Sequence, residues 1–186
     1  FCDLAFNGGG ADYAEWLERL SATDLHPGDV VGVFGGRIAL ETDGADQVLV
    51  ISTNPVLVGN SAGAEFDDRE GYEKVAFLGQ APVRVRGRVA VGDFIVASGH
   101  DDGTAVAVAP SALRVTDLPL VIGTAWEAST GEGTSLVNTA IGVNQSAAAT
   151  AIFERLEKTI DARDATVDML LDRLEALEAT VAKLQQ

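Results

Sequence analysis

The sequence predicts a mainly β head, an antiparallel sandwich or barrel, followed by a long C-terminal α-helix that forms a parallel coiled coil. Three observations predict this. Glycine is abundant, with 20 among 186 residues, and aromatic residues make up only 6%. Short runs rich in Val, Ala and Leu recur between turn residues through most of the chain. From residue 153 onward, apolar side chains instead follow alternating three- and four-residue steps. We therefore expect an upstream segment at 1–11, a head at 12–143, a linker at 144–149 and a coiled-coil helix at 150–186.

Roughly ten short strands are expected in the head, each bounded by Gly, Asp, Asn or Pro turns. Gly35 and Gly36 join the first two strands as a tight hairpin. The polar stretch Asn60–Lys74 predicts a long surface loop. Because no helical pattern separates the strands, we expect antiparallel pairing. The predicted strands are Val30–Phe34, Arg37–Leu40, Gln47–Ser52, Val56–Gly59, Val75–Leu78, Pro82–Val91, Phe94–Ala97, Thr104–Val108, Leu120–Ala125 and Leu136–Val143.

The C-terminal pattern is a heptad repeat whose a and d positions are apolar with one exception, Arg163. A lone helix with so narrow an apolar stripe has nothing to bury it against except copies of itself. The pattern therefore predicts a homo-oligomer joined at its C-terminus. The apolar a and d residues, called the seam below, are Phe153, Leu156, Ile160, Val167, Leu170, Leu174, Leu177, Val181 and Leu184.

Two features bear on the number of chains. Val and Ile at a with Leu at d favour two strands in general. Arg173 at g and Glu178 at e, around Leu174 and Leu177, form an arrangement typical of short trimeric coiled coils, in which the Arg pairs with a neighbouring chain's Glu. We therefore predict a homotrimer. Arg163 at a d position costs stability, and it either fixes the register or binds an anion on the axis.

Charge and composition exclude several classes of function. The formal net charge of −15 argues against nonspecific binding to nucleic acid or to an anionic membrane. Cys2 is the only cysteine, so no intrachain disulfide is possible. No run approaches the ~20 apolar residues of a membrane span, and no signal peptide is seen. The chain opens on Phe1, which predicts a fragment or a processed product. No zinc spacing or phosphate loop is visible, so we expect no metal and no cofactor.

The sharpest local motif runs from Asp12 to Glu18 and follows three glycines. Asp12 and Glu15 could act as general acid and base in peptide cleavage if their pKa values are split. The same spacing fits an amphipathic helix with Asp12 as its N-cap and Trp16 and Leu17 on its apolar face. From spacing alone, the helix is the favoured interpretation.

Seven short motifs occur in order between about residues 11 and 130. They are Asp12-Tyr13-Ala14-Glu15-Trp16, Pro27-Gly28-Asp29-Val30-Val31-Gly32, Val50-Ile51-Ser52-Thr53-Asn54-Pro55, Val58-Gly59-Asn60-Ser61, Val75-Ala76-Phe77-Leu78-Gly79, Val91-Gly92-Asp93-Phe94-Ile95 and Ile122-Gly123-Thr124-Ala125-Trp126-Glu127. Together these motifs resemble one family, the intramolecular-chaperone, self-processing domain (peptidase family G-two) at the C-terminus of phage pre-neck appendage and tail-spike proteins.

The resemblance implies a C-terminal domain that trimerises the spike or fibre segment preceding it in the same polypeptide. It also implies self-cleavage by Asp12 and Glu15, with Gly10 and Ala11 forming the scissile region just before the motif. Because this chain retains Phe1–Gly10, we expect it to be uncleaved, inactivated or a member of the family that never cleaves. The location implied is the virion tail, or the host cytoplasm during assembly. The alternative is a non-cleaving structural or adhesive trimer that binds a surface glycan or a virion partner.

Other candidate sites are less specific. A Ser–Lys dyad of a second phage chaperone family would require Lys74 with Ser61, but no matching signature surrounds them. Arg84, Arg86 and Arg88 alternate on one strand face and could bind a phosphate or pair across subunits, although a solvated face is the simpler explanation. His100, Asp101 and Asp102 could contribute to a metal site, but such a turn needs no metal. A free-standing enzyme is disfavoured because no convergent catalytic set is visible.

Overall fold

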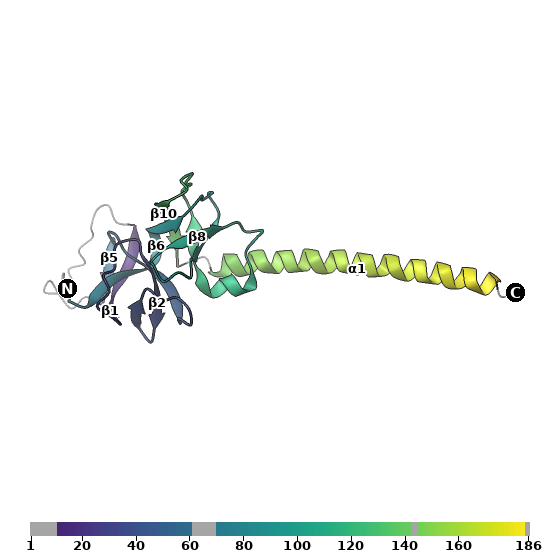
Figure 1. The fold of residues 1–186 in the computed structure, drawn as a ribbon, viewed down its shortest axis with the longest axis horizontal. Coiled ribbons are helices and arrows are strands. Elements are labelled where there is room, and N and C mark those ends of the chain that lie inside the picture. The colour runs from purple at the N-terminus through teal and green to yellow at the C-terminus, as the bar shows by residue number, and fades with distance from the viewer. Residues whose placement is uncertain (1–10, 61–69, 143–144, 185–186) are drawn as a thin grey trace.

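The computed structural model describes residues 11–60, 70–142 and 145–184, without the side chains of 145–147, 178–180 and 182–184. Ten strands form the head, and one long helix, α1 (Gln145–Leu184), extends away from it (Figure 1). A short 3₁₀ helix, η2 (Val115–Leu120), lies between the eighth and ninth strands. The strands are β1 (Asp12–Arg19), β2 (Val30–Phe34), β3 (Arg37–Ala39), β4 (Gln47–Ile51), β5 (Leu57–Gly59), β6 (Tyr72–Arg86), β7 (Phe94–Ala97), β8 (Ala105–Val108), β9 (Val121–Ala125) and β10 (Thr134–Ile141).

The long strand β6 organises the head because it takes part in two closed rings of strands. Its C-terminal half belongs to a five-stranded barrel in the order β6–β10–β9–β7–β8. Its N-terminal half belongs to a second five-membered ring, β6–β4–β2–β3–β1. Strand β5 adds to β1 outside the second ring. Closure pairs the strand edges, so most of the head exposes no long free edge to other chains.

The two faces of β6 contribute to two cores. Val83 and Val85 are fully buried in a cluster that fills the barrel and extends between the rings to Val50 and Ala76. Val75 belongs instead to the cluster inside the second ring. Val75 and its neighbour Ala76 fall in different clusters because successive side chains on a strand point to opposite faces, so one strand can serve both cores. Each fully buried valine of this kind is worth about 1.5–3 kcal/mol of transfer free energy.

Strand β6 replaces two predicted strands, Val75–Leu78 and Pro82–Val91, and includes the end of the predicted loop. The interruption expected at Gly79 and Pro82 does not occur. The backbone N–H groups of Gln80 and Arg84 donate to the carbonyls of Ala11 and Gly28 rather than to β10. Pro82 lies between them with its nitrogen on the same side, so its missing N–H removes no bond to β10.

The prediction of a helix at Asp12–Leu20 is wrong, because this segment forms β1. Strand β1 pairs antiparallel with β6 along its whole described length, and burial alternates from Asp12 to Leu17. Tertiary pairing therefore overrides the local helical pattern. The expectation of purely antiparallel pairing is also wrong. β1 runs parallel to both β3 and β5, and β6 runs parallel to β8.

Helix α1 begins at Gln145, inside the segment expected to be a linker; Asn144 lies outside the described residues. Its first turns pack on the head, where Ala148 and Ile152 join a cluster with Phe94 and Leu113. Arg155 adds a hydrogen bond from Nη1 to the carbonyl of Ser111 at 2.8 Å. In the described part of the chain, no helix has both the length and the apolar character needed to cross a membrane.

Candidate functional site

The backbone at the start of β1 is held from both sides. The carbonyl of Ala11 accepts a hydrogen bond from Gln80 N–H at 2.9 Å, and the carbonyl of Asp12 accepts one from Val56 N–H at 2.9 Å. Gly79 is required beside it, because a Cβ there would lie 2.3 Å from the Ala11 carbonyl oxygen. The peptide between Ala11 and Asp12 therefore has a defined position at the start of β1, and β1 lies on the side of the head away from α1 (Figure 1).

The Asp12 carboxyl is buried, with 3% of the residue exposed, and accepts a hydrogen bond from Ser52 Oγ at 2.7 Å. Ser52 follows β4, forty residues along the chain. Burial raises the pKa of Asp12 above its ordinary value of 3.8, and the Ser52 hydrogen bond opposes this shift. The carboxyl thus keeps its proton to higher pH than an exposed aspartate does, which is a property of groups that act as acids in catalysis.

Glu15 lies on the opposite face of β1 from Asp12. The two residues are three apart, and on a strand an odd spacing reverses the direction of the side chain. The burial pattern agrees, since Asp12, Ala14 and Trp16 are buried whereas Tyr13 and Glu15 are half-buried. Glu15 Oε1 accepts a hydrogen bond from Tyr13 Oη at 2.5 Å. The strand therefore does not direct the two carboxylates to a common point, and a joint role for them stays a hypothesis. Gly10 of the predicted scissile region lies outside the described residues.

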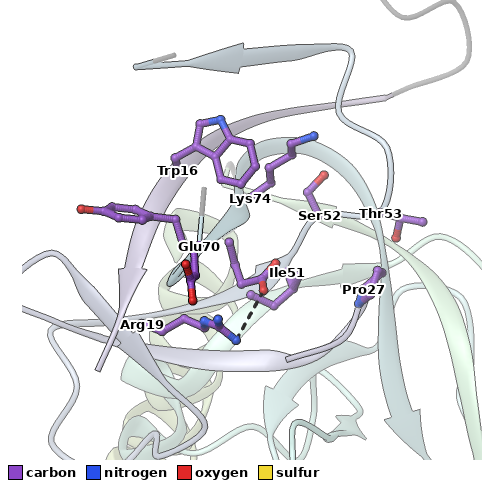
Figure 2. A pocket seen from close by; sticks show the side chains of 10 residues that line it. Trp16, Arg19, Pro27, Ile51, Ser52, Thr53, Glu70 and Lys74 are labelled. Atoms are coloured by element: carbon purple, nitrogen blue, oxygen red, sulfur yellow. Dashed lines mark ion pairs between the residues drawn. The ribbon is translucent and has the colours of Figure 1, made fainter. Parts of the chain in front are cut away.

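A groove of about 720 Å³ opens beside the Asp12–Ser52 pair, between β1, β4 and β6. Figure 2 shows Lys74 and Ser52 near one end of this groove and Arg19 toward the other. Lys74 Nζ lies 4.9 Å from the centroid of the Trp16 ring, a cation–π contact. The lining residues are Trp16, Arg19, Pro27, Ile51, Ser52, Thr53, Glu70, Tyr72, Glu73 and Lys74.

Ser52 is the site residue that the sequence interpretation missed. It was noted only as part of the Val50–Pro55 motif, and its proximity to Asp12 depends on the pairing of distant strands. The predicted Ser–Lys dyad used Ser61, which lies outside the described residues. The structure places Ser52 in the same groove as Lys74 instead, with Ser52 N–H donating to the Lys74 carbonyl at 2.8 Å.

Two of the three alternating arginines are paired within the chain. Arg84 Nε lies 3.3 Å from Asp29 Oδ1, and Arg86 forms an ion pair with Asp102 at 2.5 Å. Arg88 forms no ion pair within the described residues, so a phosphate would meet compensated charge at two of the three arginines. Hydrogen bonds from Thr104 and Arg86 lower the pKa of Asp102. Among the residues that the structure describes, no group of three or more His, Cys, Asp or Glu side chains is positioned to hold a metal.

The second candidate site is the seam of α1. Every seam residue whose side chain is described is exposed, from 44% at Leu156 to 65% at Phe153. The side chains of Glu178 and Leu184 lie outside the described residues. The head packs against Ala148, Ala151, Ile152 and Arg155, which occupy heptad positions c, f and g. These positions are centred well away from a and d, so the head leaves the seam free.

No family model matches this chain, and no curated protein matches it. Two solved structures do. The C-terminal fragment of bacteriophage phi29 gene product 12 matches with 18% identity and a TM-score of 0.49, covering 70% of this chain and 99% of that one. The pre-mature phi29 gene product 12 matches with 19% identity and a TM-score of 0.50, covering 74% of this chain and 22% of that one. The chain therefore shares a fold with part of a phage protein.

Proposed function

We propose that this chain is the C-terminal assembly domain of a phage-type tail spike or fibre, in which the seams of three α1 helices join to form a parallel coiled coil. One observation carries the proposal: the seam is exposed along the helix while the head packs on a different side. The fold shared with phi29 gene product 12 supports the phage context. The heads would then surround the top of the coil without blocking it.

The proposed mechanism is physical. Intertwined β-structure in an upstream spike requires non-local pairing between three long chains, which is slow and exposes unpaired edges. A coiled coil forms from local contacts and raises the effective concentration of the attached segments. It also gives the three chains a common axis and a common direction.

Sedimentation equilibrium of the whole chain tests the assembly. We expect a trimer at micromolar concentration, with Arg173 at g paired to Glu178 at e of the next chain. Leu171, which is 53% exposed at position e, widens the apolar stripe beside the seam and favours three chains over two. A stable monomer would contradict the proposal, and a dimer would contradict its stoichiometry.

We further propose that the head cuts the chain between Ala11 and Asp12. The Gln80 N–H that bonds the Ala11 carbonyl would polarise it toward attack by water. Asp12, whose pKa is raised by burial, would give its proton to the leaving amine nitrogen. Water supplies the hydroxyl that completes the new carboxyl of Ala11, and the remaining proton of that water returns to the Asp12 carboxylate, which is thereby restored to its protonated form. Ser52 would hold the Asp12 carboxyl in place, and Glu15 would support the far face of β1 through Tyr13.

A denaturing gel of the chain expressed with its natural upstream segment tests cleavage. Two bands are expected from the unmodified protein, one full-length band from Asp12→Asn, and slowed cleavage from Ser52→Ala. Glu18→Gln, on the same strand, is the matched control and should cut normally. A single full-length band from the unmodified protein would refute cleavage and leave the non-cleaving structural or adhesive trimer.

A further inference from the structure

Arg163 is the one charged residue in the a and d positions of α1. In the single chain its side chain is exposed, and so is that of its neighbour Asp164. Within the part of the chain that the structure describes, neither residue forms an ion pair. Three guanidinium groups brought together at one layer of a trimer would repel one another in a partly dry core, so this layer needs negative charge.

Helical geometry places a carboxylate where that charge is needed. At 100° per residue, the order around the contact side of the helix is g, d, a, e. In a parallel coil, the d and g side of one helix faces the a and e side of the next. Asp164 is at e and only about 1.5 Å farther along the axis than Arg163. Arg163 of one chain therefore faces Asp164 of its neighbour at nearly the same height.

The g positions around this layer offer Asp164 no competing cation. They are occupied by Thr159 and Thr166, whose hydroxyls already donate to the carbonyls of Arg155 and Ala162 in the same helix, at 2.9 and 2.8 Å. One heptad beyond Thr166, the g position holds Arg173, and the arrangement changes to the ordinary g-to-e pairing with Glu178. The positive charge of Arg163 thus takes the place of the basic residue that the g positions near this layer lack.

We propose that Arg163 of each chain pairs with Asp164 of the next, forming a ring of three interchain ion pairs that sets the register of the coil. This inference rests on the proposed trimer. If one helix shifts by one heptad relative to its neighbour, its Arg163 faces the neighbour's Glu157 instead of Asp164. The shifts between the three chains must sum to zero around the ring. The Arg163 of another chain therefore faces Leu171, which carries no charge. Only the in-register parallel trimer satisfies all three arginines. The Arg163 layer therefore makes the coil less stable than an apolar layer would, but it restricts the three chains to a single alignment.

A double-mutant cycle on the whole chain tests the pairing, read by sedimentation equilibrium. Asp164→Ala should raise the trimer dissociation constant about a hundredfold, since each of three partly buried pairs is worth about fivefold. In the Arg163→Leu background, which removes the charge, Asp164→Ala should have almost no effect. The control is Asp161→Ala at position b, on the outer side of the same turn, which should leave the constant unchanged.

Several outcomes would overturn the pairing without affecting the proposed function. Equal effects of Asp164→Ala and Asp161→Ala would do so, and so would an undiminished effect of Asp164→Ala in the Arg163→Leu background. A trimer whose stability depends on the identity of the salt anion (chloride, bromide or sulfate) but not on Asp164 would replace the ion pair with a bound anion. If the unmodified chain is a monomer, the proposed function itself fails.

Discussion

The head and the helix bury apolar surface in opposite ways. Ile95 in the barrel is fully buried by residues of its own chain, whereas Leu170 on the seam remains 54% exposed. The head closes its strands into rings and completes its core alone. The described seam residues of the helix remain exposed in the single chain, and in the proposed trimer they would be buried against copies of themselves. The stability of the head should therefore be independent of protein concentration, whereas that of the helix should follow mass action.

The change from side chains buried against the head to side chains exposed on the seam occurs between two adjacent residues of α1. Ile152 is 3% exposed and packs on the head, and Phe153 beside it is 65% exposed at the first seam position. Adjacent helical residues point about 100° apart, so one turn of α1 can contact the head and still offer the seam to partners. Head packing and chain association are therefore compatible, and mutations can separate them.

The largest expected effect is the loss of the oligomer on placing a charge in the seam. Leu170→Asp would put three carboxylates in one core layer and raise the dissociation constant by more than about a thousandfold. Sedimentation should then show monomers, and circular dichroism should show reduced helix content. The melting of the head should be unaffected.

Met169→Asp is the matched control for this variant. Met169 is 53% exposed, almost the same as Leu170, but it occupies position c outside the seam. Its substitution should leave the trimer intact. Equal loss of assembly from both variants would mean that the contact surface of α1 is not the a and d stripe.

The complementary change is Ile95→Ala in the barrel. Removing this buried side chain should lower the free energy of unfolding of the head by about 2–5 kcal/mol, because a cavity remains in a closed core. Urea unfolding followed by tryptophan fluorescence measures the loss. The control, Val91→Ala at a residue 66% exposed, should change it by less than about 0.5 kcal/mol. Dissociation of the Ile95→Ala trimer below its unfolding transition would show that the two regions are coupled.

The parts predicted well from the sequence are those determined by local pattern. The hairpin at Gly35 and Gly36 is confirmed, with Phe34 paired to Arg37, because two positive-φ residues suffice to specify such a turn. The long C-terminal helix is likewise confirmed. A heptad repeat and a tight turn are each visible within a few neighbouring residues. What the seam binds stays a prediction, because it depends on other chains.

The parts that were missed depend on distant partners. The local pattern of residues 12–19 favours a helix, and only the pairing of β1 with residues 72–79 makes this segment a strand. The same pairing buries Asp12, which the sequence pattern suggested as the exposed N-cap of a helix. Ser52 could not be identified as its partner, because a hydrogen bond between a strand residue and a loop residue forty positions apart leaves no local periodicity. The site was therefore predicted as a pair of carboxylates, whereas the structure groups Asp12 with a hydroxyl.

The smallest expected effect concerns that hydroxyl and sharpens the comparison at the end of the head opposite to α1. Burial raises the pKa of Asp12 in the folded chain, so folding favours the protonated form. The contribution of Asp12 to stability is therefore full when the pH is below the pKa of Asp12 in the unfolded chain, and it is lost as the pH rises through the pKa in the folded chain.

Ser52→Ala removes the hydrogen bond that opposes the rise in pKa, so the pKa of Asp12 should rise further. The pH range over which Asp12 contributes to stability should then extend to higher pH. The change should cost about 1 kcal/mol well above the folded pKa of Asp12, where Ser52 bonds a charged carboxylate, and less below that pKa, where the carboxyl is protonated. Carboxyl carbon NMR titration reads the pKa directly, and Ser52→Thr, which keeps a hydroxyl, is the control. An unchanged or lowered pKa of Asp12 in Ser52→Ala would mean that backbone groups rather than Ser52 hold this carboxyl. The dissociation constant of the trimer should be the same with and without Ser52→Ala, because Asp12 is not part of the seam.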